Sequence, residues 1–361
     1  MGKSYGENLK LSIFGTSHGP EIGMTMEGIP AGLPVDTEKL QSFLLRRAPG
    51  QNAWSTPRKE ADIPEFQGGI LNGFTTGQAI TAVIKNKNVH KKDYEELKYI
   101  PRPGHADYAA WMKFGLDFDM SGGGPFSGRM TAPLCIAGGM CTQWLEEKGI
   151  RIGAHIRNIG VCGDYLFDRL NPELDAICTD FPIIKPENKE RMLEWIADAQ
   201  ANSDSVGGRI ECAITGVPAG LGDALFGGVE SRIAQIVYGI PGVKAIGFGL
   251  GSPATGCMYG SEVNDPFVVS NGVVKTLTNN CGGILGGITN GMPIIFDVTI
   301  KPTPSIAKPQ RSVNLKTMEE VTLEIHGRHD PCIVPRAVPV VEAAAAIAIY
   351  DLILDNSTED R

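Results

Sequence analysis

The chain has 361 residues, with 33 Lys and Arg against 41 Asp and Glu, which gives a formal net charge of −8 at pH 7. Its 42% hydrophobic and 20% charged residues exclude a disordered chain, and the acidic balance argues against general nucleic-acid binding. The 45 glycines are roughly 12% of the chain, against an average of about 7%. This excess follows no Gly-X-Y period, so it indicates a folded backbone that often needs positive φ or close approach to a ligand.

Neither a membrane-spanning helix nor a signal peptide is expected. No uninterrupted apolar run approaches about 18 residues, and the first 15 residues lack a charged stretch followed by an apolar one. The eight cysteines lie far apart without a C-x-x-C pair, which is typical of reduced thiols rather than of disulfides or a zinc site. We therefore expect a soluble cytoplasmic protein that binds neither nucleic acid nor a membrane, and the length suits two domains or one large one.

The chain begins with two predicted strands and a helix. Apolar and polar residues alternate over residues 9–13 and again over 22–26, which predicts two strands joined by a loop. The second strand ends at G-I-P-A-G-L, residues 28–33, and Asp36 can cap the helix that follows.

The same order of elements recurs about 188 residues later. A strand over residues 210–214 ends at G-V-P-A-G-L, residues 216–221, and apolar residues at helical spacing follow. A repeated strand, turn and helix, with five of the six turn residues identical, indicates an internal duplication. No low-complexity linker separates the copies, so we expect a single domain over residues 1–361 with two related halves, approximately 9–150 and 209–355.

Three further helices are predicted over residues 131–147, 187–200 and 340–354, and residues 356–361 are expected to fray. Residues 247–252, G-F-G-L-G-S, lack the last glycine of a dinucleotide motif and are interpreted as the end of a strand. These elements favour one compact unit of helices and mainly antiparallel sheet.

Residues 15–19, G-T-S-H-G, match the G-x-S-x-G turn that presents a nucleophilic serine in hydrolases. That turn needs a helix directly after it and several strands before it, whereas here one strand precedes it and an alternating strand follows. The other interpretation is a strand–strand loop in which His18 is structural.

Two glycine-rich loops are candidates for ligand contacts. Residues 121–131, S-G-G-G-P-F-S-G-R-M-T, lead into a predicted helix, so they form either an anion site at its N-terminus or a plain tight turn. Residues 281–287, C-G-G-I-L-G-G, are a second such loop of lower specificity. Neither loop matches a P-loop or a complete dinucleotide motif.

Three charged segments are further candidates from residue patterns. Residues 102–107, R-P-G-H-A-D, form either an acid–base site in which charges tune the histidine or a solvated surface loop. Residues 46–59 hold four cations, which suit a phosphate or carboxylate ligand or else a solvated run of charge. The basic, Asn-rich residues 85–92 are interpreted as plain surface.

Residues 326–332, H-G-R-H-D-P-C, hold two histidines, an aspartate and a cysteine that are all potential metal ligands. Their spacing fits no common zinc signature, so no metal is expected. A cluster of titratable groups beside Arg328 and Arg336 is better interpreted as an acid–base site for an anionic ligand.

Taken together, eight segments in this order resemble the chorismate synthase family over nearly the whole chain. They are residues 14–19, 28–34, 102–108, 121–124, 216–222, 282–291, 301–306 and 327–340. The resemblance implies an α+β fold with a helix layer sandwiched between mainly antiparallel β-sheets, internally duplicated. It also implies a carbon–oxygen lyase of aromatic amino acid biosynthesis, which converts 5-enolpyruvylshikimate 3-phosphate to chorismate by anti 1,4-elimination of phosphate.

The resemblance further implies a requirement for reduced FMN without net redox change, and a homotetramer. It leaves open whether the protein reduces its flavin with NADPH or depends on an external flavin reductase. The implied FMN contacts are Pro125, Phe126, Ser127, Pro241, Gly242, Gly286, Lys301, Pro302, Thr303, Pro304, Ser305 and Arg328.

By the same resemblance, His18 would be the acid at the departing phosphate and His105 would maintain the protonation state of the reduced flavin. Asp330 would assist removal of the ring proton, and Ser17 and Ser127 would assist by hydrogen bonds. The arginines implied to hold the phosphate and the two carboxylates of the substrate are Arg47, Arg129 and Arg336.

The chain departs from the family pattern at several of these positions. Thr16 stands in place of a glutamate, and Ala48 and Ala53 stand in place of arginines. Residues 125–130 read P-F-S-G-R-M where the family has R-S-S-A-R-E. The alternative hypothesis is therefore a catalytically impaired paralogue that still binds flavin or anions.

Overall fold

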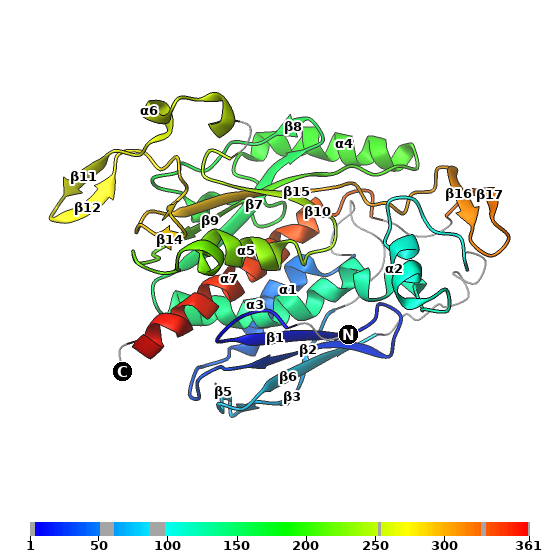
Figure 1. Ribbon diagram of the computed structural model, residues 1–361, viewed down its shortest axis with the longest axis horizontal. Helices are drawn as coiled ribbons and strands as arrows, with labels where there is room; N and C mark the ends of the chain where they lie inside the picture. The colour runs from blue at the N-terminus through cyan, green and yellow to red at the C-terminus, as the bar shows by residue number, and fades with distance from the viewer. Residues whose placement is uncertain (1–3, 51–60, 87–97, 252–253, 326–329, 360–361) are drawn as a thin grey trace.

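The structure is a computed structural model that describes residues 4–50, 61–86, 98–251, 254–325 and 330–359. A central layer of helices lies between two sheets, one above it and one below it in Figure 1. Every strand pair recorded within these ranges is antiparallel. The predicted α+β class, with helices between mainly antiparallel sheets, is confirmed.

The smaller sheet has the strand order β1-β2-β6-β3, and the larger sheet has the order β10-β15-β9-β7-β8. The strands of the smaller sheet are β1 (Lys10–Gly15), β2 (Glu21–Glu27), β3 (Glu65–Gly68) and β6 (Ile80–Lys85). Those of the larger sheet are β7 (Arg151–Ile159), β8 (Cys162–Gly163), β9 (Gly208–Thr215), β10 (Val243–Phe248) and β15 (Ile294–Ile300).

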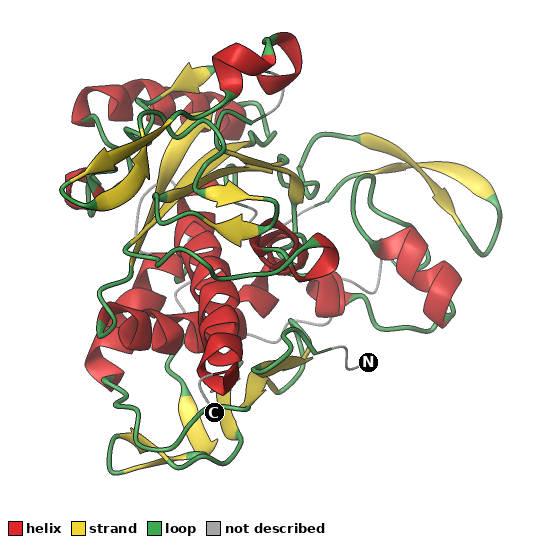
Figure 2. Cartoon of the chain, turned by 60° about the vertical axis from the view of Figure 1, so that its left-hand side comes forward, coloured by secondary structure: helices red, strands yellow, loops and turns green. Residues whose placement is uncertain are grey.

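The helix layer is formed by α1 (Thr37–Arg47), α3 (Thr131–Glu146), α5 (Val229–Val237) and α7 (Val334–Glu359), and Figure 2 shows it from a second side. Outside this layer lie α2 (Asp107–Phe114), α4 (Lys189–Ala201) and the short α6 (Gly260–Val263). Four hairpins complete the fold: β4 (Ile70–Leu71) with β5 (Phe74–Thr75), β11 (Phe267–Ser270) with β12 (Val273–Thr276), β13 (Ile284–Leu285) with β14 (Ile288–Thr289), and β16 (Gln310–Asn314) with β17 (Glu319–Leu323).

Most predicted elements are confirmed. β1 and β2 pair across the predicted loop, and α3 and α4 occupy the helices predicted at 131–147 and 187–200. Asp36 caps α1, because its carboxylate accepts hydrogen bonds from the backbone N–H groups of Glu38 and Lys39, each at 2.9 Å.

The last helix is longer than predicted at both ends. The prediction began at residue 340, directly after Pro339, but α7 starts at Val334 and keeps Pro339 inside it. It also runs through residues 356–359, where fraying was expected. Within Val334–Asp355, a window of 18 residues has a mean hydropathy of 1.9, which would suit a membrane span by length and composition and which the rule of uninterrupted apolar runs did not detect. Because 89% of that stretch is buried within the fold, α7 is the core helix of this domain.

The two halves share one order of elements. Two paired strands are followed by a helix, a strand, a short hairpin, a returning strand and a long helix, from β1 to α3 and again from β7 to α7. The four strands β1-β2-β6-β3 occupy the same relative order as β7-β9-β15-β10. We propose from this correspondence that the second half starts at β7 rather than near residue 209.

A second repeated motif, which sequence reasoning missed, closes each predicted turn. Residues 68–77, G-G-I-L-N-G-F-T-T-G, and 282–291, G-G-I-L-G-G-I-T-N-G, form the two equivalent hairpins. The buried Thr75 hydroxyl donates to Pro30 O at 2.7 Å and accepts from Leu33 N at 2.9 Å. Thr289 repeats both contacts at 2.7 and 2.9 Å with Pro218 and Leu221. The glycine loop at 281–287 therefore has a structural role that needs no ligand.

Helices α3 and α7 pack so closely that a side chain cannot fit between them at Gly138. A Cβ atom there would lie 2.3 Å from Ala343 Cβ and 2.7 Å from the carbonyl oxygen of the same residue. We expect Gly138→Ala to lower the free energy of unfolding by about 1–3 kcal/mol, because the neighbouring atoms belong to helix backbone and must shift. Urea denaturation measures this loss.

The control for that substitution is Gly260→Ala at the start of α6, where a Cβ atom would meet nothing within 4 Å. Equal unfolding free energies for the two variants would contradict the close packing of α3 on α7.

One histidine is buried between two carboxylates at the larger sheet. The ring of His155 on β7 lies 3.0 Å from Glu211 and 3.6 Å from Asp164. Burial by itself would lower the pKa of His155, but the hydrogen bonds and charges of Asp164 and Glu211 outweigh it and raise this pKa. The same carboxylates accept backbone hydrogen bonds from Ile184 and Phe167, so the charged ring helps to hold the segment after β8 on the sheet.

A raised pKa in the folded state makes the stability contribution of His155 depend on pH. The contribution is fully present below the unfolded value of about 6.5 and is lost as pH rises through the higher folded pKa. We expect Tm to fall over this window in the wild type and to fall less steeply in His155→Gln. Thermal unfolding between pH 6 and about pH 9 measures both slopes, and parallel curves would contradict the charged state of His155.

Candidate active site

Two histidines lie against one glycine turn. A Cβ atom on Gly122 would sit 2.0 Å from Cε1 of His18, and one on Gly123 would sit 3.1 Å from Cε1 of His105. Gly122, Gly123 and Gly124 have φ values of 59°, 94° and 52°, a region that other residues rarely adopt. The turn therefore needs glycine for its conformation and for the space that the two rings occupy.

The predicted serines adjoin the same turn. The missing side chain of Gly122 would also approach Ser17 Oγ at 3.1 Å, and that of Gly123 would approach Ser127 Cβ at 3.3 Å. The Ser17 N–H donates to Gly124 O at 3.3 Å. Four of the five predicted catalytic residues thus converge from three loops: Ser17 and His18 lie between β1 and β2, His105 lies before α2, and Ser127 follows the glycine turn.

The two open interpretations of these loops are now decided. Strand β2, and not a helix, follows the G-T-S-H-G loop, so the hydrolase turn is excluded and the strand–strand loop is confirmed. The S-G-G-G segment forms an irregular 3-10 turn (Ser121–Phe126), and α3 begins only at Thr131. Gly123 N–H already donates to Met120 O at 2.9 Å, so the tight turn fits better than an anion site at a helix N-terminus.

His105 is oriented by a buried ion pair. Arg102 binds Asp107 through two hydrogen bonds of 2.7 Å, and His105 Nδ1 lies 3.1 Å from the same carboxylate. Burial disfavours the charged Asp107, but the hydrogen bonds from Arg102 and His105 outweigh it and hold its pKa well below the ordinary value. The segment is therefore not a solvated surface loop, and a permanent carboxylate faces Nδ1 of the histidine.

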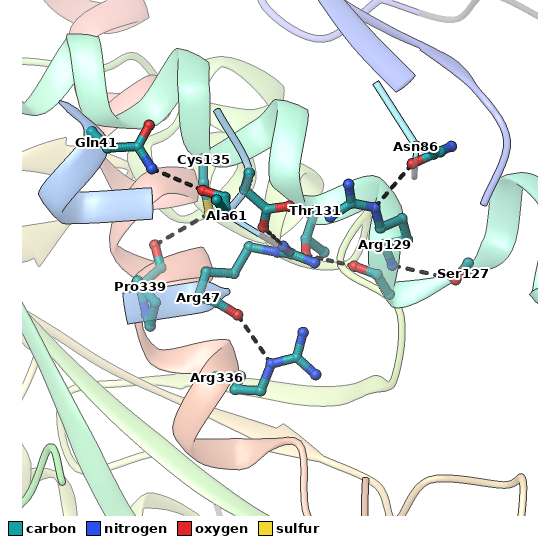
Figure 3. A network of polar contacts seen from close by, with 12 residues as sticks. Gln41, Arg47, Ala61, Asn86, Ser127, Arg129, Thr131, Cys135, Arg336 and Pro339 are labelled. Atoms are coloured by element: carbon teal, nitrogen blue, oxygen red, sulfur yellow. Dashed lines mark hydrogen bonds and ion pairs between the residues drawn. The ribbon is translucent and has the colours of Figure 1, made fainter. Parts of the chain in front are cut away.

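Three predicted substrate arginines meet in one network, drawn in Figure 3. Arg47 and Arg129 each pair with one carboxylate oxygen of the buried Asp62. Arg336 pairs with Asp330 and donates from Nε to Arg47 O at 3.0 Å. The structure thus connects the fifth predicted catalytic residue, Asp330, to the arginines.

Positive charge is crowded in this network. Among the residues that the structure describes, three guanidinium groups face the two carboxylates of Asp62 and Asp330, and the formal charges of these five groups sum to +1. Burial lowers the pKa of Arg47, and the nearby positive charges of Arg336 and Arg129 act in the same direction against the opposing effect of Asp62. An anionic ligand would relieve this repulsion, so the cluster is suited to bind one.

The cationic segment 46–59 divides into different roles. Arg46 is structural, because its guanidinium binds both oxygens of the buried Glu342 on α7 at 2.6 and 2.9 Å. Arg47 is buried beside Asp62 and Thr131. The interpretation of four solvated cations is therefore wrong for the buried Arg47, while Arg46 is exposed but held by Glu342. Arg58 and Lys59 lie outside the described residues.

The predicted flavin segment 301–305 lies against the loop of His105. Lys301 Nζ donates to Gly104 O, and a Cβ atom on Gly104 would lie 3.3 Å from Pro304 Cβ. Lys301 N–H donates to Gly242 O at 2.9 Å, which brings positions 241–242 to the same place. The Oγ1 atom of Thr303 is buried and has no hydrogen-bond partner among the residues that the structure describes. A buried hydroxyl of this kind suits a polar ligand, so these residues fit the flavin expected there.

Two predicted cofactor residues are not brought to this cluster. Gly286 is exposed at the tip of the β13–β14 hairpin, which lies at the left of Figure 1, whereas α2, next to His105, lies at the right. Within this chain the assignment of Gly286 to the same site is therefore not supported. Gly286 occupies the position of Asn72 in the first hairpin, and both residues have a positive φ, which accounts for a glycine at this position. Arg328 lies outside the described residues.

Sequence reasoning missed two residues of the site. Asp62 holds two arginines, and Asn86 accepts a hydrogen bond from Arg129 Nε at 3.3 Å. The interpretation of residues 85–92 as plain surface is therefore wrong at Asn86, while residues 87–92 lie outside the described part. For Asp62, the only sequence signal was its position shortly after the four cations of residues 46–59. No sequence signal indicated Asn86.

The comparisons with known proteins agree on one family. Residues 9–354 match the family described as chorismate synthase. A protein of Lancefieldella parvula named chorismate synthase is 45% identical over 99% of this chain and 98% of its own length, and one of Thermococcus gammatolerans is 46% identical over 97% of each. A crystal structure titled chorismate synthase is similar with a TM-score of 0.78 and 28% identity, over 97% of this chain and 93% of that one.

Removing the charge of Asp62 should destabilise the protein. In Asp62→Asn the buried guanidinium groups of Arg47 and Arg129 lose their shared counter-ion, so we expect the free energy of unfolding to fall by about 3 kcal/mol. The matched control is Asp175→Asn, whose partner Arg151 is 53% exposed and whose own side chain is 83% exposed, so it should cost less than about 1 kcal/mol. Similar urea midpoints for the two variants would show that Asp62 does not stabilise the buried arginines.

Proposed function

Because the chain belongs to the chorismate synthase family, we propose that it converts 5-enolpyruvylshikimate 3-phosphate to chorismate. The reaction is an anti 1,4-elimination: phosphate leaves one ring carbon with the electron pair of the C–O bond, and a proton leaves another. The match over residues 9–354, with relatives 43–46% identical along nearly their whole length, carries this proposal. The comparisons do not favour the alternative of an impaired paralogue, which rests on the sequence departures at Thr16, Ala48, Ala53 and residues 125–130.

The arrangement of the site supports distinct roles for its residues. Phosphate is a poor leaving group until it is protonated or paired with positive charge, and His18 can donate a proton from a buried position beside the glycine turn. The network of Arg47, Arg129 and Arg336, in which three guanidinium groups lie close together, binds the anionic groups of the substrate. Asp330 accepts the ring proton, and Arg336 orients its carboxylate.

We propose reduced FMN as the cofactor, which supplies transient electron density that lowers the barrier to C–O cleavage. The residues that would hold it are positions 125–127, 241–242 and 301–305. The contacts of Lys301 and Pro304 with Gly104, next to His105, and the unpaired Thr303 hydroxyl support this assignment. Flavin reduction by added NADPH alone would identify the protein as its own reductase, and its failure would indicate an external one.

A homotetramer in the cytoplasm is the proposed working state. The β11–β12 hairpin projects from the body of the molecule and carries apolar side chains in solvent, with Phe267 64% and Val269 76% exposed (Figure 1). An exposed apolar arm of this kind is typical of subunit contacts. Sedimentation equilibrium measures the assembly, and a monomer at micromolar concentration would contradict it.

The deciding experiment is an anaerobic assay of the purified protein with 5-enolpyruvylshikimate 3-phosphate and reduced FMN. Chorismate and inorganic phosphate should form in equal amounts. Flavin binding without any chorismate would refute the proposed activity and favour the impaired paralogue.

Two substitutions test the assigned roles. His18→Ala removes the proton donor and Asp330→Asn removes the proton acceptor, so we expect each to lower kcat about 100-fold or more while the fold stays intact. Circular dichroism checks the fold, and Asp175→Asn, on the exposed pair with Arg151, should keep the wild-type kcat. A near-normal rate in either variant would refute the role given to that residue.

A further inference from the structure

One side chain connects the His18 loop to the arginine network. Asn86 follows β6 directly, at the point where β6 pairs with the start of β2. Its Nδ2 lies 2.9 Å from Gly19 O and 3.3 Å from Thr16 O, and its Oδ1 lies 3.3 Å from Arg129 Nε. The loop that carries His18 and the predicted substrate arginine therefore share one amide.

The chemistry of the partners determines which way this amide points. Two backbone carbonyls can only accept hydrogen bonds, so the atom that faces both of them must be the NH2 group. The Arg129 guanidinium can only donate, so it must face the carbonyl oxygen of the amide. A flipped amide would oppose both neighbours, and a side chain without both a donor and an acceptor cannot replace it.

Asn86 also restrains the loop through its backbone. Its N–H donates to Pro20 O at 3.0 Å, and within the loop Gly19 N–H donates to Thr16 O at 3.1 Å. One residue thus binds the carbonyl groups of three of the five loop residues from 16 to 20. His18 lies between these anchored carbonyls, with its ring against Gly122.

We propose that Asn86 is a positioning residue that places His18 for proton transfer and sets its position relative to Arg129. This proposal rests on the proposed function, in which His18 protonates the phosphate that the arginines bind. The proton donor and the leaving phosphate must approach within hydrogen-bond distance. The Asn86 side chain contacts both the loop of His18 and Arg129, so it fixes the distance between the donor and the arginine that binds the phosphate.

Two variants distinguish the contacts of Asn86 with the loop from its contact with Arg129. Asn86→Ala removes both sets of contacts, whereas the isosteric Asn86→Asp keeps an acceptor for Arg129 but cannot donate to the carbonyls of Thr16 and Gly19. If the loop contacts place His18, both variants should lower kcat about 10- to 100-fold at saturating substrate and reduced FMN. Recovery of kcat in Asn86→Asp would show that only the contact with Arg129 matters, and it would overturn the proposal.

A double-mutant cycle tests whether Asn86 acts through His18. In the His18→Ala background, Asn86→Ala should change kcat by less than about twofold, since the group that it positions is absent. Multiplicative losses would overturn the proposal. The matched control is Asn72→Asp, an exposed amide at the tip of the β4–β5 hairpin, which should leave kcat unchanged.

A measurement without turnover keeps this test independent of the proposed function. Hydrogen exchange at the backbone N–H groups of residues 16–19 should be faster in both Asn86 variants than in the wild type and in Asn72→Asp, and unchanged exchange would overturn the proposal. If exchange is faster but wild-type protein forms no chorismate, the proposed function fails and the restraint of the loop by Asn86 stands. If His18→Ala keeps the wild-type rate, the role of His18 fails instead.

Discussion

The site depends on one electrostatic constraint: buried guanidinium groups must find carboxylates. A charged group removed from water is costly unless it is paired and hydrogen-bonded. Asp62 meets this requirement for Arg47 at the end of α1 and for Arg129 just before α3, and Asp330 meets it for Arg336 on α7. The ion pairs of Asp62 therefore connect α1 to the segment before α3, and the hydrogen bond from Arg336 Nε to Arg47 O connects α7 to the same point. The proposed substrate binding depends on the three guanidinium groups that meet there.

The second constraint is steric, and it explains part of the glycine excess. Gly122 leaves space that the ring of His18 occupies and that a Cβ atom would fill, and a Cβ atom on Gly123 would crowd the ring of His105. Other glycines serve the scaffold instead. In the two equivalent hairpins, Gly69 and Gly283 have φ values of 82° and 84°, which allow each hairpin to close a G-x-P-A-G-L turn. Glycine abundance thus has two causes in this chain, a crowded site and a repeated turn.

The two halves correspond in their strands and helices but not in the loops that carry predicted site residues. The loop between β1 and β2 is short and carries Ser17 and His18, whereas the equivalent β7 and β9 are joined by a segment that contains β8 and α4. Likewise the segment before α3 contains the glycine turn and α2. The shared strands and helices build the two-sheet frame and carry Arg47 and Arg336, whereas Ser17, His18 and the glycine turn lie in loops where the halves differ. Loops on a rigid frame are a common place for such sites.

The sequence by itself determined the features that depend on near neighbours. Alternation and capping predicted β1, β2 and α1, and motifs in a shared order predicted the family and the fold class. The tertiary structure alone decided which side chains meet. It placed Asp62 and Asn86 on Arg129, assigned Arg46 to Glu342, separated Gly286 from the rest and kept Pro339 inside α7. Such contacts join residues far apart in the chain, so they follow from how the layers pack and leave no mark in local pattern.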